Sequence, residues 1–338
     1  MAALAGITRY VGGVPHVLAF VVAGIALAGI AWVVSFGTEQ LGGRFGPAIT
    51  GFLQSTLGNL PEFFVVIFAL NAGELIVAET AIVGSILVNA LLVLGMVIVA
   101  GARREKDGIM RFSARLPNDT ATLLLVATFI IVLVGLANMA HDPASHHTKT
   151  ISIIGAVAIL AVYGVWARQY LTTPQATDSA PHEKPRLSTR EALVLLALGG
   201  LGAAFVSDWF VHALQPTIET LHISRAFAGL VIVAIAGNAV EHAVGIVLAA
   251  KGQSELAISV VKNSVAQIAA FLYPLLVLVS LLTKTQLTFA LAPVYIGALF
   301  GTAVIVWQIT GDGEATAFEG TALMATFVIL ATVAAFES

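Results

Sequence analysis

One short string, Gly-Asn-x-x-Glu, occurs twice in this chain, each time inside a long apolar segment. The first copy ends at Glu62 and the second at Glu241, 179 residues later. The same spacing relates Ser85 to Ser264 without a gap, so the chain is predicted to consist of two related halves. A charged side chain at membrane depth costs about 3 kcal/mol or more and by default marks an ion or proton path. The paired motifs therefore predict a cation site to which both halves contribute.

The composition places this site in a membrane. Of 338 residues, 58% are hydrophobic and 10% are charged, whereas soluble domains carry about 25% charged residues. The net charge of −3 and the lack of a dense basic stripe argue against nucleic acid as a partner. Because the chain has no cysteine, disulfides, thiolate zinc sites and cysteine nucleophiles are excluded. The first apolar stretch lacks a small-residue cleavage site, so we expect a membrane helix there and not a removed signal peptide.

Ten apolar segments of about 20 residues can be counted, and their continuous hydrophobicity predicts helices and not a barrel. They cover 14–41, 46–71, 76–101, 114–138, 150–171, 189–215, 223–250, 255–282, 286–309 and 316–337. The polar stretch 173–188 is the predicted linker between a first five-helix repeat, 1–172, and a second, 189–338. Five is an odd number, so the second repeat is expected to be inverted, as in many secondary transporters.

The distribution of Lys and Arg predicts the orientation. Loops on the side of the linker carry eleven of them, and loops on the side of both termini carry four. Cytoplasmic loops hold the excess of basic residues, so the linker is expected inside the cell and both termini outside.

The first motif is predicted to break its helix. Gly58 and Pro61 both weaken a helix, and a broken helix at membrane depth can present carbonyl oxygens to a cation. Glu62 and Asn59 lie on a similar face. Carboxylate, amide and carbonyl oxygens suit hard cations such as calcium, magnesium or sodium. Two facing carboxylates without a metal would repel each other and bind protons, so the pair predicts a site that holds either a divalent cation or protons.

The second motif is expected to repeat this ligand set with Asn238 and Glu241. The segments that follow the motifs supply further polar groups, namely Ser85 with Asn89 and Ser264 with Gln267. All four are candidate ligands of the cation or proton, either directly or through water. Amides inside membrane helices are more often hydrogen-bond partners between helices.

Other polar residues in apolar segments have simpler interpretations. Glu39 and Asp208 are read as end residues of the first helix of each half. Lys262 is read as a lysine whose charge extends to the membrane surface, with an internal counter-charge as the alternative. His242 is as compatible with packing as with proton relay.

These motifs resemble the calcium/proton antiporter (CAX) family of the calcium/cation antiporter superfamily. The residues that carry the resemblance are Gly58-Asn59 with Glu62, Gly84-Ser85-Ile86-Leu87-Val88-Asn89, Gly237-Asn238-Ala239-Val240-Glu241-His242, Ser264 and Gln267. The resemblance implies the sodium/calcium exchanger-like fold, with Glu62 and Glu241 as a shared calcium and proton site. It also implies calcium export driven by inward protons, with calcium as substrate and no cofactor.

The chain departs from the family pattern at Pro61 and at Lys262-Asn263, where a glycine is common in place of Asn263. The family often has an extra helix before the two repeats, and the sequence predicts none here. Three alternatives stay open: an exchanger for sodium, potassium or manganese, a cation channel, and an intramembrane enzyme, for which no fingerprint is present. The expected location is the cell (inner) membrane, and the oligomeric state is left open.

Overall fold

The computed structural model is all-helical apart from one short ribbon, and it describes residues 1–11, 13–42, 56–172 and 186–337. In the first half the helices are α1 (Ala2–Tyr10), α2 (His16–Gly42), α4 (Leu60–Ala72), α5 (Leu75–Leu87), α6 (Leu94–Ala102), α7 (Arg115–Met139) and α8 (Thr148–Thr172). In the second they are α9 (Thr189–Leu221), α10 (Arg225–Phe227), α11 (Ala234–Ala250), α12 (Ser254–Gln267), α13 (Tyr273–Val279), α14 (Pro293–Thr310) and α15 (Ala317–Phe336).

Shorter segments join or interrupt these helices. The π-helical segments are η1 (Val88–Val93), η4 (Ala228–Val233) and η5 (Ile268–Leu272), and the 3-10 turns are η2 (Pro143–His147) and η6 (Ser280–Leu282). The strands are β1 (Ile109–Arg111) and β2 (Glu314–Thr316).

Nine helical stretches within the described ranges are long and apolar enough to cross a membrane. The remaining predicted segment, 46–71, is described from Thr56 onward, as a shorter apolar helical stretch, Thr56–Ala72, that is interrupted at Asn59. Most of the predicted linker, residues 173–185, lies outside the described residues. The prediction of an all-α, multi-pass membrane protein is confirmed.

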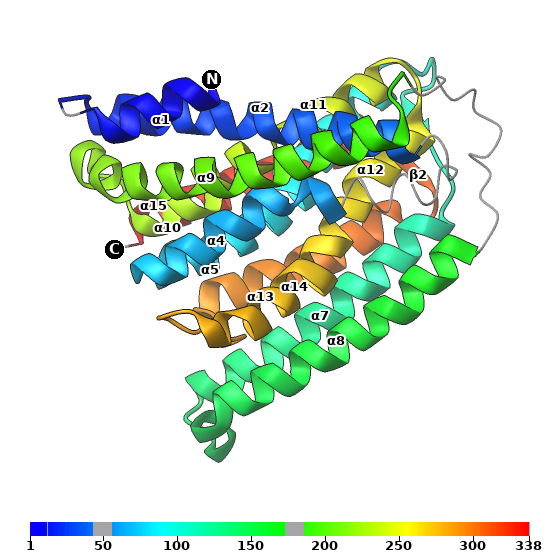
Figure 1. Ribbon diagram of the computed structural model, residues 1–338. Coiled ribbons are helices and arrows are strands. Elements are labelled where there is room, and N and C mark those ends of the chain that lie inside the picture. Colours follow the sequence, from blue (N-terminus) through cyan, green and yellow to red (C-terminus); the bar gives the residue numbers. More distant parts are fainter. Residues whose placement is uncertain (12, 43–55, 173–185, 338) are drawn as a thin grey trace.

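The first helices of the two halves lie side by side. α2 and α9 make the most extensive helix pair of the described chain, and they run in opposite directions (Figure 1). This antiparallel pair agrees with the inverted relation of the halves that the odd number of spans predicted.

Three features of the helices differ from the sequence-based expectation. A short helix, α1, precedes the first predicted span and packs against α2 and α9. α9 continues to Leu221, so Asp208 lies within it and not at its end. α14 begins at Pro293 and not near residue 286, because the preceding segment is extended and buries the alternate side chains Leu287, Phe289 and Leu291. An average of hydropathy cannot separate such an extended segment from a helix.

The π-helical segments η1 and η5 occupy corresponding places in the two halves. Asn89 lies in η1, and Gln267 is the residue that precedes η5. A π-helical turn adds a residue to the turn and is frequent at functional sites. The hydropathy pattern of the sequence does not predict these turns.

Glycines allow the two halves to approach closely at the core. A Cβ atom on Gly84 of α5 would lie 2.3 Å from the Leu230 carbonyl oxygen, and one on Gly229 would lie 2.0 Å from the Thr80 hydroxyl. Only glycine permits backbone contact at this distance. The two glycines therefore allow α5 and η4 to pack closely against each other.

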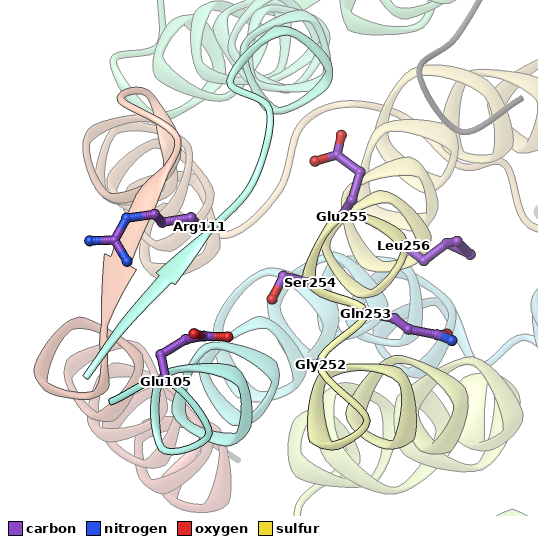
Figure 2. A pocket seen from close by; sticks show the side chains of 7 residues that line it. All are labelled: Glu105, Arg111, Gly252, Gln253, Ser254, Glu255 and Leu256. Atoms are coloured by element: carbon purple, nitrogen blue, oxygen red, sulfur yellow. The ribbon is translucent and has the colours of Figure 1, made fainter. Parts of the chain in front are cut away.

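The loops at the linker end of the molecule form a further contact between the two halves. β1 pairs with β2 in antiparallel register, and Arg111 forms ion pairs with Asp107 and Glu314. Hydrogen bonding to Arg111 holds the pKa of Asp107 below its usual value. Figure 2 shows the pocket between the α6–α7 loop, which carries Glu105, and the start of α12. Beside it, the Ser113 amide donates to the Glu255 carboxylate at 2.6 Å.

Candidate functional site

The first motif breaks its helix, as predicted. The chain turns at Asn59, and α4 starts at Leu60 with Pro61 in its first turn. Proline fits this position because an amide of the first turn has no partner within the helix. Glu62 therefore lies in the first turn of α4. The carbonyl of Pro61 accepts a hydrogen bond from Ser207 of α9 at 3.2 Å, which anchors the break to the α2–α9 pair.

The second motif does not break. α11 runs without interruption through Asn238 and Glu241, and the irregular turn, η4, precedes it. The expectation that the second motif also offers loose carbonyl oxygens is therefore wrong. The reason is local, because Ala239 and Val240 stand where the first motif has Leu60 and Pro61.

The two motifs contact each other reciprocally. A Cβ atom on Gly58 would lie 2.7 Å from a Glu241 carboxylate oxygen, and one on Gly237 would lie 3.8 Å from the Glu62 Cβ atom. Each motif glycine thus makes room for the glutamate of the other half. A small cavity at this crossing is lined by Gly58, Gly237, Asn238, Val240 and Glu241, together with Ala31 and Ser35 of α2.

Hydrogen bonds fix the second motif more than the first. The Ser264 hydroxyl donates to a Glu241 oxygen at 2.6 Å. The Asn238 amide donates to the Ser85 hydroxyl and to its own helix at Ala234, both at 3.1 Å. The Asn89 amide donates to the Ser85 carbonyl at 3.0 Å. Asn89 therefore bonds within its own helical stretch, whereas an amide in a membrane helix was expected to bond between helices.

The first motif keeps its polar atoms unpaired. Glu62 is 3% exposed and Asn59 is 1% exposed, and none of their four side-chain polar atoms has a hydrogen-bond partner among the described residues. Ser85, Asn238 and Glu241 are side chains that face the Glu62 carboxylate. A buried polar atom without a partner costs about 1–3 kcal/mol. These oxygens fit a hard cation or water, both of which would satisfy them.

The sequence missed two residues beside the site. Thr56 lies one turn before Asn59, and its hydroxyl is 3.5 Å from the Gln267 amide oxygen. Ser207 anchors the break, as described above. The spacing of Thr56, Asn59 and Glu62, three residues apart each time, was available in the sequence, but Ser207 has no such signal.

Lys262 lies away from the site. Its side chain is 2% exposed, and its ammonium group donates to the Thr310 hydroxyl of α14 at 3.2 Å. The interpretation that it extends to the membrane surface is wrong, because the ammonium group is buried and bonds to α14 inside the molecule. His242 is buried beside Glu241, and its Nε2 atom has no partner in the described part of the chain.

Comparison with known proteins identifies the fold. The sodium/calcium exchanger protein model matches residues 15–168 and 191–336. The solved structure of native YfkE superposes with a TM-score of 0.81 at 25% identity, covering 99% of this chain and 96% of that one. The structure of the H+/Ca2+ exchanger CAX has a TM-score of 0.79 at 15% identity, covering 99% and 90%, which supports the fold alone. The predicted exchanger fold is confirmed.

Curated relatives extend over nearly the same length. The Ca2+/H+ antiporter ChaA of Bacillus subtilis (strain 168) is 30% identical over 321 residues, covering 94% of this chain and 92% of that protein. A vacuolar calcium ion transporter of Schizosaccharomyces pombe is 33% identical over 326 residues, covering 92% of this chain and 77% of that protein. The match of the family model to both halves and the identity to these transporters lead to one conclusion: the chain belongs to the sodium/calcium exchanger protein family.

Proposed function

We propose that this protein is a secondary active antiporter that exchanges Ca2+ for H+ by alternating access. Its relatives over most of the chain carry the names of Ca2+/H+ antiporters, and the family is one of transporters and not of enzymes. The observation that carries the proposal is the crossing of the two motifs, where each glycine contacts the glutamate of the other half.

The proposed ligands of Ca2+ are the Glu62 and Glu241 carboxylates, with Asn59 and Asn238 as neutral neighbours. Two carboxylates neutralise one divalent cation, and hard oxygen donors suit calcium. When the cation leaves, two like charges near each other in a buried site favour the uptake of protons. Ca2+ and H+ therefore compete for the same oxygens, which is the minimum requirement of an exchanger.

The remaining polar residues act on these ligands. Ser264 orients Glu241, and Ser85 receives the Asn238 amide and faces Glu62. Asn89 bonds to the Ser85 carbonyl, and Gln267 contacts Thr56 beside the first motif. Ca2+ and H+ are substrates in this scheme, and it includes no cofactor. We further propose the cell (inner) membrane as its location, with both termini outside.

Transport in proteoliposomes with an imposed pH gradient tests the function. Wild-type protein should move Ca2+ against the proton flux without sodium, whereas Glu62→Gln and Glu241→Gln should each abolish exchange. Glutamine keeps the volume and removes the charge, so both variants should fold. Glu105→Gln makes the same change at an exposed loop carboxylate and should exchange normally.

Three kinds of result would contradict the proposal. A requirement for sodium or potassium, or transport of manganese in preference to calcium, would assign the chain to a related exchanger. Single-channel currents would assign it to a channel. Normal exchange by Glu62→Gln would contradict the proposal that Ca2+ and H+ share one site.

A further inference from the structure

A row of polar groups leads into the protein from the linker end of α8. The Asn263 amide of α12 donates to the Tyr170 hydroxyl and to the Ser259 hydroxyl, each at 3.4 Å. Tyr170 and Ser259 are partly exposed, whereas Asn263 is 4% exposed. The row therefore starts at the surface and continues below it.

The row continues toward the site. Gln267 lies one helical turn after Asn263 on the same face of α12, and Tyr163 lies two turns before Tyr170 on α8. The Tyr163 hydroxyl faces Thr56, whose own hydroxyl is 3.5 Å from the Gln267 amide oxygen. From Thr56, the spacing of three residues leads to Asn59 and then to Glu62.

The hydrogen bonds along the row are longer than usual. Direct hydrogen bonds are typically about 2.9 Å long, and those along the row measure 3.4 and 3.5 Å. The Asn263 amide oxygen and both polar atoms of Asn59 are buried and have no partner within the described ranges. Buried polar groups in this condition normally bind water.

In the first half, the position that corresponds to Asn263 is closed. Gly84 stands at the position that corresponds to Asn263, and the backbone of Leu230 closes directly over it. Asn263 instead fills its position with a side chain whose oxygen is unpaired. Glu241, for its part, borders the cavity beside α2. The polar row therefore leads toward Glu62, whereas Glu241 borders a separate cavity.

We propose that the groups from Tyr170 to Thr56 line a water path between solvent at the linker end of α8 and Glu62. This inference rests on the proposed function, in which Glu62 exchanges its proton with solvent. Along the path a proton passes through water from hydronium in solvent to a Glu62 oxygen, and it returns the same way without another reactant. Asn263 is a positioning residue that holds water where the row passes from the surface into the protein.

Cysteine labelling tests the path because the chain has no cysteine of its own. Asn263→Cys and Thr56→Cys are compared with Val265→Cys, which is 3% exposed at a similar depth on the opposite face of α12. The reagent is the small cation 2-aminoethyl methanethiosulfonate, applied to the purified full-length protein, and intact mass spectrometry follows the rate. The first two variants should react at least tenfold faster than the third.

Equal rates for Asn263→Cys and Val265→Cys would overturn the path. If Asn263→Cys does not fold, Thr56→Cys decides between the same two outcomes. Wild-type exchange is measured in parallel, so that a failure of the proposed function is separate from a failure of the path. Slow labelling in a protein whose wild type exchanges Ca2+ for H+ contradicts the path alone.

Discussion

Glu62 and Glu241 occupy equivalent sequence positions but have different environments. Glu241 accepts a short hydrogen bond from Ser264 and lines a cavity. Glu62 is enclosed in the first turn of α4, and the described residues offer it no hydrogen bond. The strict repeat in the sequence thus produces two carboxylates that are ordered to different degrees before a cation binds.

The serines should consequently differ in importance. Ser264 donates to a carboxylate, and such a bond contributes about 1.5–3 kcal/mol, whereas Ser85 accepts from a neutral amide, which contributes about 0.5–1.5 kcal/mol. Ser264→Ala should therefore lower Ca2+ affinity roughly tenfold or more, and Ser85→Ala only a few-fold. Calorimetric titration of the purified variants measures both. Equal losses would contradict the asymmetry.

At the scale of elements, close backbone contact and irregular turns shape the site. α5 and η4 contact each other through Gly84 and Gly229, while η1 and η5 recur at matching places in the two halves. The break at Asn59 directs Glu62 toward the second motif, and unbroken α11 carries Glu241 to the same place.

Gly84→Ala should destabilise the protein by about 1–3 kcal/mol, the usual cost of overpacking a core. The new methyl group would meet the Leu230 carbonyl oxygen at 2.3 Å, and backbone cannot move aside like a flexible side chain. Gly164→Ala on α8 is the matched control, since nothing lies within 4 Å of its Cβ position. Thermal unfolding in detergent should show a lower Tm for Gly84→Ala only. A Tm equal to that of the wild type would show that α5 and η4 are not tightly packed.

Much of this arrangement could be predicted from the sequence. The repeated motif located both glutamates and their serines, and Gly58 with Pro61 indicated the break. Contacts between segments far apart in the chain were not predictable, such as Ser207 with Pro61 or Lys262 with Thr310, because they depend on how helices pack. The extended segment before Pro293 was missed because its alternating apolar residues raise hydropathy as a helix would.

At the scale of the whole molecule, loops cluster at two ends. The α6–α7 loop, the start of α12 and the β1–β2 ribbon meet at the linker end. At the other end, Arg225 pairs with Glu74, and the Lys284 amide donates to Asn71. This grouping agrees with the two sets of loops from which the orientation was predicted.

The predicted orientation places the linker end in the cytoplasm. Ser113→Cys should therefore react with an impermeant thiol reagent only after the cells are opened, because its loop lies at the basic end. His146→Cys lies beyond the far end of α7 in an exposed turn and should react in intact cells. Labelling of Ser113→Cys from outside, with protection of His146→Cys, would reverse the orientation.

The central claim is that Ca2+ and H+ compete for Glu62 and Glu241, and proton release on Ca2+ binding tests it most directly. Calorimetric titration of the wild type in buffers with different ionisation enthalpies gives the number of protons released per Ca2+ bound. The account predicts release of protons and a Ca2+ affinity that falls as the pH is lowered, because protons then occupy the same oxygens. Glu105→Gln should behave like the wild type, and Glu62→Gln should lose both the affinity and the release. Binding of Ca2+ with unchanged affinity across pH and without proton release would contradict the shared site.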